Sequence, residues 1–378
     1  PFRRKPPPPF TTSTFQQAAG NRLKLSPARA MAAAQALYQQ GFITYMRTDS
    51  TTLSDTAVRA ARNEVVDRFG REFLPAEARS YVNKVRNAQE AHEAIRPAGD
   101  RFVDPNTVRK RVPPAQASVY KMIWRRTVAS QMTDVAGETL RIELTSDIAA
   151  PGYEQANLAA TGTTIHHAGF RKAYENLELA SDDQGTEAED DERLLPTLTA
   201  GQTVDVVDVA AEGHSTRPPA RYTESSLVKG MEEHGVGRPS TYAGIVQTIQ
   251  KKYVFKKGSA LVPTLAAFAV TRLLEKHFPR VVDYTFTADL EDDLDRIANG
   301  ELDEVEFLRD FWRGSDNDIG LKAKVHDRAE EIVGPEVNFV ELGLSDSEEP
   351  VLARYSKFGP YVQLGEVSKS IPEDVVVG

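Results

Sequence analysis

The sequence predicts a multi-domain protein of mixed α and β structure. Its 378 residues correspond to about two to four structural units of ~100–200 residues each. Apolar residues recur at helical spacing up to about residue 130 and again beyond about residue 223. Between these parts, apolar and polar side chains alternate in several runs, which is typical of antiparallel strands.

Charge is distributed unevenly along the chain. The whole sequence has a net charge of −9, which taken alone argues against a polyanionic partner. Residues 1–130, however, hold 22 basic and 10 acidic residues, a balance of +12, whereas residues 131–378 hold 24 basic and 45 acidic residues, a balance of −21. Such asymmetry indicates a nucleic acid as partner of the first segment.

Composition excludes several classes of protein. Because the chain has no cysteine, it has no disulfide framework, zinc ribbon, iron–sulfur cluster or cysteine nucleophile, and a cytoplasmic location is expected. The longest apolar stretches, such as Leu261–Val270, reach about half the ~18 residues of a membrane span, so no membrane partner is expected. With neither an initial methionine nor a signal peptide, the sequence is expected to be a fragment of a longer gene product.

Helix boundaries are clearest in the first segment, which is expected to be a helical domain. Ser26 can cap a helix over 27–40, Pro27 suits its first position, and Gly41 can take the left-handed conformation that ends it. Two further helices are expected, one between Ser54 and Gly70 and one over Tyr120–Gln131.

The middle segment is expected to be mainly antiparallel sheet. Residues 140–144 alternate between apolar and polar side chains, and residues 204–209 do so again. The run Glu175–Glu192 holds nine acidic residues and no basic one. It indicates a solvated loop or hairpin tip, with an acidic functional tail as the alternative.

A second helical unit is predicted from about residue 223. Helices over 224–234 and 240–250 form a helix-turn-helix, and a hairpin over 253–262 would be the wing of a winged helix. Later elements are expected as helices over 264–277 and 287–299, and as short strands around Arg354–Val362 that begin another small β-rich domain.

The first candidate for chemistry is Tyr45. A tyrosine hydroxyl has a pKa near ~10 and needs a base or a positive environment to act as a nucleophile. Arg47 would project from the same side of an extended segment and could hold a phosphate, with Thr44, Thr48 and Asp49 as further donors and acceptors. The alternative is a half-buried aromatic residue beside a surface arginine.

The second candidate is the block Gln89–Pro97. On a helix, His92 and Arg96 would share a face and could both meet a phosphate, while Glu90 and Glu93 orient them. The block lacks the second histidine of a zinc protease motif. A ladder of salt bridges on a helix surface is the alternative interpretation.

The third candidate is the turn Gly235–Tyr242. Its glycines, Arg238, Ser240 and Thr241 could form an anion site at a helix start, although a well-capped turn explains them almost as well. The next hairpin is basic and aromatic, which suits a phosphate backbone, or it protects a sheet edge with lysines. Its cations are Lys251, Lys252, Lys256 and Lys257.

Four blocks together carry a family resemblance. They are, in order, Gly41–Ser50 (GFITYMRTDS), Gln89–Pro97 (QEAHEAIRP), Pro218–Glu224 (PPARYTE) and Gly237–Tyr242 (GRPSTY). They closely resemble the signature blocks of the bacterial DNA topoisomerase I family of type IA enzymes. The resemblance covers about residues 10–335.

The resemblance implies roles for the candidate residues. Tyr45 would attack a DNA phosphodiester and form a 5′-phosphotyrosine bond, Arg47 would stabilise the scissile phosphate, and His92 would assist the active-site network. Thr44, Thr48, Asp49 and Arg96 would contact DNA near them. A single-strand groove would be lined by Arg238, Ser240 and Thr241, with Lys251 or Lys252 in place of the arginine of the family's Q-x-R-G-Y motif.

The resemblance also implies a fold, a type IA toroid that lacks one domain. Residues 1–130 would be an α-rich lid, and residues 131–214 part of a β-rich arch. Residues 215–335 would be a helical base with a winged-helix element, and residues 336–378 the start of a C-terminal topoisomerase repeat.

One departure from the family concerns metal and activity. The family's TOPRIM domain, whose carboxylates bind Mg²⁺, has no counterpart here, so Mg²⁺ is expected on that absent domain and no metal on this chain. Asp293 and Asp295 have a suitable spacing but fit a solvated helix face. The fragment is expected to bind single-stranded and negatively supercoiled DNA as a monomer in the bacterial nucleoid, without cleaving it efficiently. The sequence has no ATP-binding loop motif.

Two alternatives remain open. A type IA topoisomerase III is of the same class, but its long decatenation insertion is not apparent. A non-catalytic DNA-binding protein could be built on the winged helix over 223–263.

Overall fold

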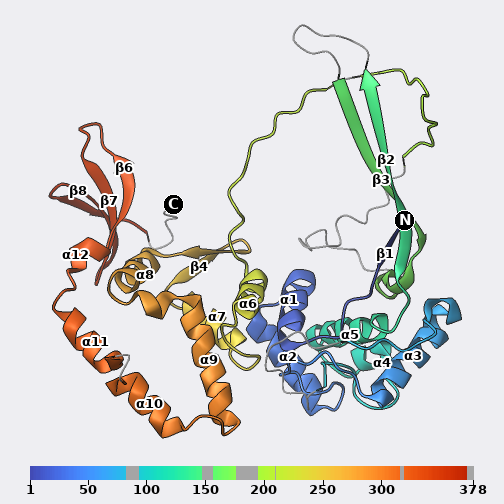
Figure 1. Ribbon diagram of the computed structural model, residues 1–378, viewed down its shortest axis with the longest axis horizontal. Coiled ribbons are helices and arrows are strands. Elements are labelled where there is room, and N and C mark those ends of the chain that lie inside the picture. Colours follow the sequence, from blue (N-terminus) through green and yellow to red (C-terminus); the bar gives the residue numbers. More distant parts are fainter. Residues whose placement is uncertain (82–92, 147–155, 176–194, 209, 316–318, 373–378) are drawn as a thin grey trace. The chain divides into compact units, whose positions relative to one another are not determined.

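The computed structural model of the chain (Figure 1) describes residues 1–81, 93–146, 156–175, 195–208, 210–315 and 319–372. The chain divides into two units. The first comprises Pro1–Lys24 and Ala32–Ala220, and the second comprises Leu25–Met31 and Arg221–Gly378. The expected lid segment 1–130 and arch segment 131–214 thus fall in the first unit, except for residues 25–31.

Helix α5 forms the centre of the first unit. Ten of its residues are buried, among them Tyr120, Ile123 and Val128, and it contacts α1, α3 and α4. A mostly apolar helix buried on most sides needs neighbours all round, and these helices supply them. The helical elements of this part are α1 (Thr12–Leu23), α2 (Pro27–Gln39), α3 (Asp55–Phe69), η1 (Arg71–Phe73), α4 (Pro105–Arg109), α5 (Pro114–Ala129) and η2 (Gly169–Tyr174).

The predicted helix ends are confirmed where local signals are strong. The Ser54 hydroxyl accepts a hydrogen bond from the Ala57 backbone amide at the start of α3, and Gly70 ends that helix with φ +104°. Helix α2 begins at Pro27 as expected. Helix α1 was not predicted from the sequence.

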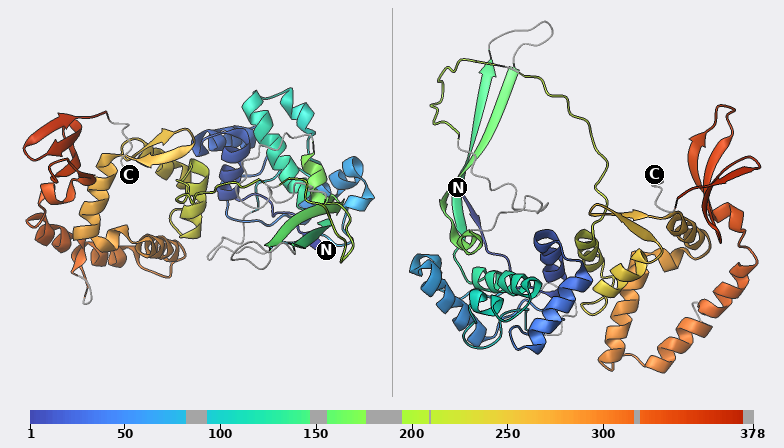
Figure 2. Two further views of the ribbon diagram at one scale, coloured as in Figure 1. Left: turned by 90° about the horizontal axis from the view of Figure 1, so that it is seen from above. Right: turned by 180° about the vertical axis from the view of Figure 1, so that it is seen from behind.

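A three-stranded antiparallel sheet follows, in the order β1-β2-β3. Its strands are β1 (Phe2–Arg4), β2 (Val135–Ser146) and β3 (Ala156–His167). The β2–β3 hairpin is long (green in Figures 1 and 2), and most described side chains of its distal half are exposed. The prediction of a sheet from about residue 137 is confirmed.

The prediction of a further strand around residues 204–209 is wrong for the residues that the structure describes. Residues 202–208 form no strand, and Val206 and Val207 are 68% and 96% exposed. Alternation predicts a strand only where one face has something to pack against, and no described element covers these side chains. The acidic run Glu175–Glu192 lies, beyond its first residue, outside the described residues.

The second unit begins with the predicted helix-turn-helix and hairpin. Helices α6 (Glu224–Glu233) and α7 (Tyr242–Gln250) share a core of Val228, Met231, Tyr242 and Val246. Strands β4 (Val254–Lys257) and β5 (Ala260–Pro263) pair antiparallel, and Ala260 also bridges Thr223 in front of α6. The hairpin therefore lies beside the helix pair, as expected for a wing.

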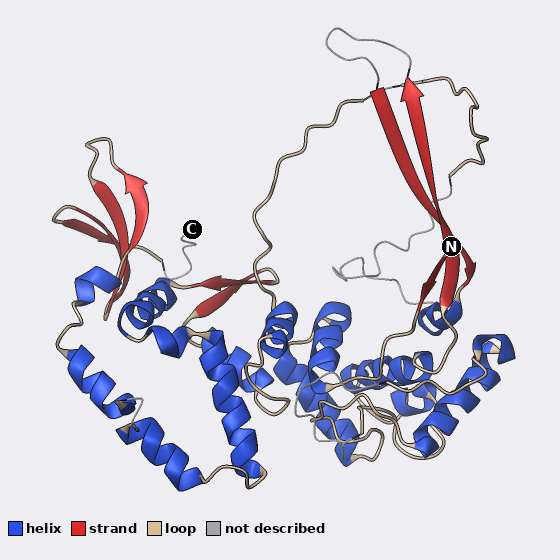
Figure 3. Cartoon of the chain, viewed as in Figure 1, coloured by secondary structure: helices blue, strands red, loops and turns tan. Residues whose placement is uncertain are grey.

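The rest of the second unit is helical and then β. Its helices are α8 (Leu265–His277), η4 (Pro279–Val282), α9 (Tyr284–Ala298), α10 (Glu304–Arg313), α11 (Gly320–Ala329) and α12 (Gly334–Val337). An antiparallel sheet ends the described chain, and Ala353 on it packs with Leu265 of α8. Its strands, red in Figure 3, are β6 (Val340–Leu344), β7 (Pro350–Ser356), β8 (Gly359–Leu364) and β9 (Val367–Ser370). None of the described helices has the length and apolarity needed to cross a membrane.

Candidate active site

The segment that carries Tyr45 starts at a fixed helix end. The Phe42 backbone amide donates to the Leu37 carbonyl oxygen at 2.9 Å, and the Gly41 amide donates to the Tyr38 carbonyl oxygen at 2.9 Å. Gly41 has φ +74°, a conformation that a side chain would strain. This hydrogen-bond pattern is a Schellman end, and it sets the direction in which the chain leaves α2.

Beyond this turn, side chains alternate between the interior and the surface. Met46, Thr48 and Ser50 are 1–3% exposed, whereas Tyr45 is 46% exposed and Arg47 is also exposed. In extended chain, residues two positions apart point to the same side. The prediction that Tyr45 and Arg47 share one side of the segment is therefore confirmed.

Thr12, in the first turn of α1, anchors the buried side of this segment. Its hydroxyl donates to the Met46 carbonyl oxygen at 2.7 Å and accepts from the Thr48 backbone amide at 2.8 Å. The Thr12 amide donates to the Thr48 carbonyl oxygen at 2.8 Å. The Thr48 hydroxyl is also used internally, because it accepts from the Ser50 amide at 3.0 Å. Thr48 thus holds the loop in this structure, while Asp49 is half-buried.

Thr44 joins the segment to the second sequence block. Its amide donates to the Arg96 carbonyl oxygen at 2.9 Å, and its hydroxyl accepts from the Arg96 amide at 3.0 Å. The same hydroxyl donates to the Ala94 carbonyl oxygen at 2.8 Å. Two blocks about 50 residues apart in sequence are therefore held edge to edge.

The second block is not helical where it is described, so the helix expected there is wrong for residues 93–97. Ile95 bridges Phe10, and Pro97 bridges Ile43, both in antiparallel fashion. Proline at position 97 disfavours the helical conformation in the residue before it, which is consistent with this extended chain. His92 lies outside the described residues, so its role stays a prediction.

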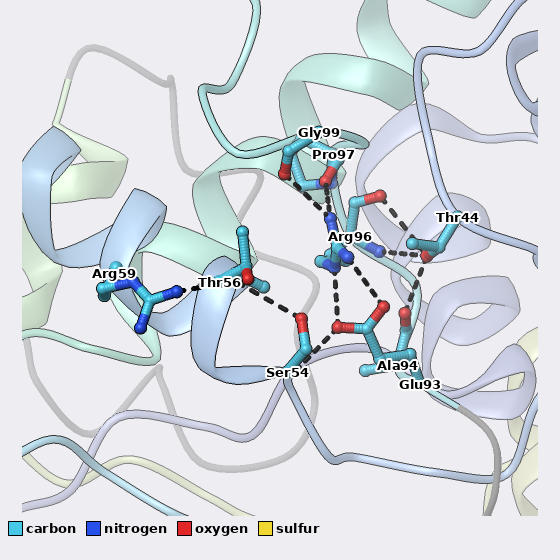
Figure 4. A network of polar contacts seen from close by, with 10 residues as sticks. Thr44, Ser54, Thr56, Arg59, Glu93, Ala94, Arg96, Pro97 and Gly99 are labelled. Atoms are coloured by element: carbon cyan, nitrogen blue, oxygen red, sulfur yellow. Dashed lines mark hydrogen bonds and ion pairs between the residues drawn. The ribbon is translucent and has the colours of Figure 1, made fainter.

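Arg96 is fully engaged within the protein (Figure 4). Its Nε and Nη2 donate to the two oxygens of Glu93 at 2.9 and 2.7 Å, and its Nη1 donates to the carbonyl oxygens of Pro97 and Gly99 at 2.8 and 3.3 Å. The residue is 9% exposed. In this structure the guanidinium braces the loop that holds Thr44, and contact of Arg96 with a phosphate stays a prediction.

Glu93, the partner of Arg96, also contacts the start of the next helix. It accepts a hydrogen bond from the Ser54 backbone amide at 2.7 Å, at the start of α3. Partial burial raises the pKa of the Glu93 carboxyl, but hydrogen bonds from Arg96 and Ser54 outweigh it and lower the pKa overall. The carboxylate is therefore stabilised in its charged form.

Aromatic neighbours complete the surroundings of Tyr45. The Tyr38 ring, from the last turn of α2, meets the Tyr45 ring edge to face with centroids 5.3 Å apart. Phe42 packs similarly against Tyr120 of α5 at 6.1 Å. Burial raises the pKa of the Tyr120 hydroxyl, which donates to the Val103 carbonyl oxygen. The sequence patterns named Glu93 as a residue that orients Arg96, but they did not reveal Tyr38 and Thr12 as supports of the site.

In the second unit, Arg238 is held by carboxylates of α9. Its Nη2 lies 2.9 Å from Asp295 and 3.3 Å from Asp292, and its Nε lies 4.0 Å from Glu291. Burial lowers the pKa of Arg238, but these carboxylates outweigh it and raise the pKa overall. Asp295 of the expected solvated face of α9 thus pairs with Arg238 while its side chain stays 35% exposed, and Asp293 pairs with Arg296 on the surface.

The other candidates of this unit lie near the start and the end of α7. The predicted cap Ser240 is exposed, and α7 begins two residues later at Tyr242, so the expected start at 240 is wrong. The Thr241 hydroxyl accepts from the Arg238 amide at 2.8 Å. Lys251 and Lys252 are exposed beyond the end of α7.

The described residues do not form a metal centre. No group of three or more histidine, aspartate and glutamate side chains within the described ranges could hold a metal ion. The acidic face of α9 is directed at the Arg238 guanidinium, whose positive charge opposes the binding of a cation there.

Comparison with known proteins identifies the family to which the chain belongs. Residues 2–309 match the family model described as DNA topoisomerase. The chain belongs to this DNA topoisomerase family. The DNA topoisomerase 1 of Mycobacterium leprae is 48% identical over 371 residues, which cover 96% of this chain and 39% of that protein. The DNA topoisomerase 1 of Mycobacterium tuberculosis is 47% identical over 99% of this chain and 41% of its own length.

A solved structure of the topoisomerase fold supports the same assignment. Full-length topoisomerase I from Thermotoga maritima superposes with a TM-score of 0.75 at 29% identity, covering 99% of this chain and 59% of that one. The mixed α and β fold class is thereby confirmed. The chain spans about two fifths of the length of the curated topoisomerases it matches.

A first prediction concerns the ion pair between Arg96 and Glu93. Arg96→Ala should lower the free energy of unfolding of the first unit by about 2–4 kcal/mol, because it leaves the Glu93 carboxylate and buried carbonyl oxygens unpaired. Urea unfolding followed by circular dichroism measures this. Arg141→Ala is the matched control, since its ion pair with Glu143 is 66% and 70% exposed and contributes below ~1 kcal/mol. Equal losses of unfolding free energy in both variants would contradict a special role of the Arg96–Glu93 pair in stability.

A second prediction concerns pH. The pKa of Glu93 is lower in the folded protein than its unfolded value of ~4.3. Its contribution to stability is therefore complete above that value and is lost as pH falls through the lowered folded pKa. Unfolding free energies of the wild type and Glu93→Gln, measured from pH 7 to pH 3, should converge toward the acid end. A difference that stays constant over this range rules the linkage out.

A third prediction concerns Arg238. Arg238→Ala should destabilise the second unit by about 1–3 kcal/mol at low salt, because Glu291, Asp292 and Asp295 then repel one another without a cation. Added salt should recover part of the loss by screening. Arg296 lies on α9 itself and pairs with Asp293 on the surface, so Arg296→Ala should cost less and respond less to salt. The expectation fails if thermal unfolding finds the two variants alike.

Proposed function

We propose that this chain is part of a bacterial type IA DNA topoisomerase I, which relaxes negatively supercoiled DNA by transient cleavage of one strand. The observation that carries the proposal is the exposed pair Tyr45 and Arg47 on one side of a segment anchored at both flanks. A nucleophile must be exposed to reach a phosphodiester, and a fixed backbone keeps its hydroxyl in one place.

The cleavage step follows from this arrangement. The Tyr45 Oη forms a bond to phosphorus, the bond from phosphorus to the 3′ oxygen breaks, and the strand is left with a 3′-hydroxyl and a 5′-phosphotyrosine. The phenol proton leaves as the ester forms, and a proton is delivered to the departing 3′ oxygen. Arg47 donates to the non-bridging phosphate oxygens and stabilises the charge that grows on them.

Strand passage and resealing complete the cycle. The ester conserves the energy of the phosphodiester, so the 3′-hydroxyl can reverse the reaction without ATP. His92 assists the active-site network around Tyr45 and Arg47. The lid of residues 1–130 carries Tyr45, residues 131–214 belong to the arch, residues 215–335 form the base with its winged helix, and residues 336–378 begin a repeat domain.

The single-stranded DNA partner is proposed to lie along the base. Arg238, Ser240 and Thr241 line its groove, and Lys251 and Lys252 extend the positive surface. For Arg238 to meet a phosphate, it exchanges its α9 carboxylates for the DNA. The protein acts as a monomer in the cytoplasm, at the bacterial nucleoid.

Magnesium is proposed to belong to another part of the enzyme. Because the described residues do not fit a metal ion, no step above depends on one in this chain. A TOPRIM domain elsewhere in the enzyme would hold Mg²⁺ and supply the second half of the active site. The 378-residue chain is therefore expected to bind DNA without cleaving it.

A second candidate function is DNA binding without catalysis. It is favoured by the helix pair α6 and α7 with the hairpin β4–β5 beside it, and by the exposed lysines around them. A type IA topoisomerase III remains the alternative within the same class, and a decatenation assay separates it from topoisomerase I.

The decisive experiment uses the complete protein, Mg²⁺ and end-labelled single-stranded DNA on a denaturing gel. The wild type should form a covalent adduct and Tyr45→Phe should form none, because only the phenol oxygen is lost. Tyr38→Phe is the matched control: it keeps the ring that packs on Tyr45 and should still form the adduct. An adduct from Tyr45→Phe would overturn the proposal, and DNA retention without any adduct would favour the binding protein.

A further inference from the structure

Three cations without acidic partners among the described residues lie on α4 and α5. Arg109 ends α4, and Lys121 and Arg125 lie four residues apart on α5. On an α-helix this spacing places two side chains on one face. Within the part of the chain that the structure describes, none of the three forms an ion pair or a side-chain hydrogen bond.

Arg125 is the unusual member of this row. It is 8% exposed, and a guanidinium buried to that degree normally has a carboxylate beside it. Here burial lowers the pKa of Arg125; the neighbouring Tyr174 opposes this effect and the neighbouring Arg22 adds to it, so that the pKa is lowered overall. Burial likewise lowers the pKa of Lys121, with Arg125 and Arg109 adding to the effect. Arg109, Lys121 and Arg125 therefore lie near one another, and none of them has a carboxylate partner among the described residues.

Two acidic residues near Tyr120 of α5 are engaged with another cation. Asp104, in front of α4, pairs with Arg68 at 2.7 Å, and Glu64 pairs with the same arginine at 2.6 Å. The positive row is therefore not balanced by them, in contrast to the exposed pairs such as Arg309 with Glu306 in the second unit.

The row also has a fixed relation to Tyr45. Tyr120 packs on Phe42, and Gln116 accepts a hydrogen bond from Gln40 at 3.2 Å, so one face of α5 supports the Tyr45 segment. Lys121 and Arg125 occupy the adjacent face of that helix. Both features lie in the first unit, and residues 1–130 of the chain carry a balance of +12.

We propose that Arg109, Lys121 and Arg125 form a second DNA-backbone surface, separate from the exposed side of the Tyr45 segment. Phosphates of a bound strand supply anionic partners for this row, and the long side chains can follow a backbone without reading its bases. The inference rests on the proposed action on DNA. It assigns to this surface affinity and salt dependence, not cleavage.

The test measures binding of the 378-residue chain to a fluorescein-labelled single-stranded 30-mer by anisotropy, across a range of salt concentrations. In the variant Arg109→Gln, Lys121→Gln and Arg125→Gln, the slope of log affinity against log salt should fall by about 0.7 per cation. Affinity at low salt should drop by about 10-fold or more. The double variant Arg109→Gln and Lys121→Gln changes exposed residues alone, so it gives a reading even if the change at Arg125 impairs folding.

The control variant removes the same number of charges from cations that already have partners. Arg141, Arg309 and Arg328, paired with Glu143, Glu306 and Glu331, are each changed to glutamine. The slope should stay close to that of the wild type. If the control and the test variant change alike, net charge and not this surface sets the affinity, and the proposal is wrong.

Competition separates the partner classes. Unlabelled oligonucleotide should displace the probe from the wild type far better than polyglutamate of equal charge, whereas equal displacement would identify a surface for acidic protein. The adduct assay of the complete protein gives the independent arm. The test variant should still form the covalent Tyr45 adduct at saturating DNA, so loss of the slope effect refutes this surface, and loss of the wild-type adduct refutes the proposed function.

Discussion

The position of Tyr45 depends on hydrogen bonds between threonine hydroxyls and backbone from distant parts of the sequence. Thr12 binds the chain on one flank, and Thr44 binds the loop at Arg96 on the other. Each hydroxyl both donates and accepts, so it satisfies backbone groups that would otherwise be buried without partners. The backbone that carries the exposed tyrosine is thus held in place although its segment belongs to no helix or sheet.

Charge in this chain is organised by local pairing and not by its net value. Arg96 and Arg238 are both engaged by carboxylates, yet they differ in setting. Arg96 is 9% exposed and braces a loop. Arg238 is more exposed and faces three acids of one helix, from which a phosphate could draw it. The negative net charge is therefore compatible with a DNA-binding surface.

Elements with strong local signals were predictable from sequence. Gly41 and Gly70 end helices because glycine tolerates positive φ, and the two-residue period placed Tyr45 and Arg47 on one side. Helix α1 escaped prediction because it buries polar residues, Thr12, Ser13 and Gln16 among them. Its capping box pairs Thr11 with Thr14 in place of the usual glutamate.

The errors in the candidate site arise from non-local contacts. Residues 93–97 are extended because they pair with Phe10 and Ile43, which no local spacing reveals. Asp295, which pairs with Arg238, lies 57 residues away from it, so local spacing does not reveal that the acidic face of α9 holds this arginine. The roles of Tyr45, His92 and the DNA-contacting residues rest on the family motifs, since chemistry is not encoded in periodicity.

The paired anchors have a mechanical consequence. A strand covalently attached at Tyr45 would pull on the protein whenever the DNA is under tension. That load passes along the backbone to Thr44 and Thr12, and from there into the Arg96 loop and the start of α1. Several hydrogen bonds at Thr12 and Thr44 share this load. The tyrosine segment can therefore transmit force to the whole helical unit without detaching from it.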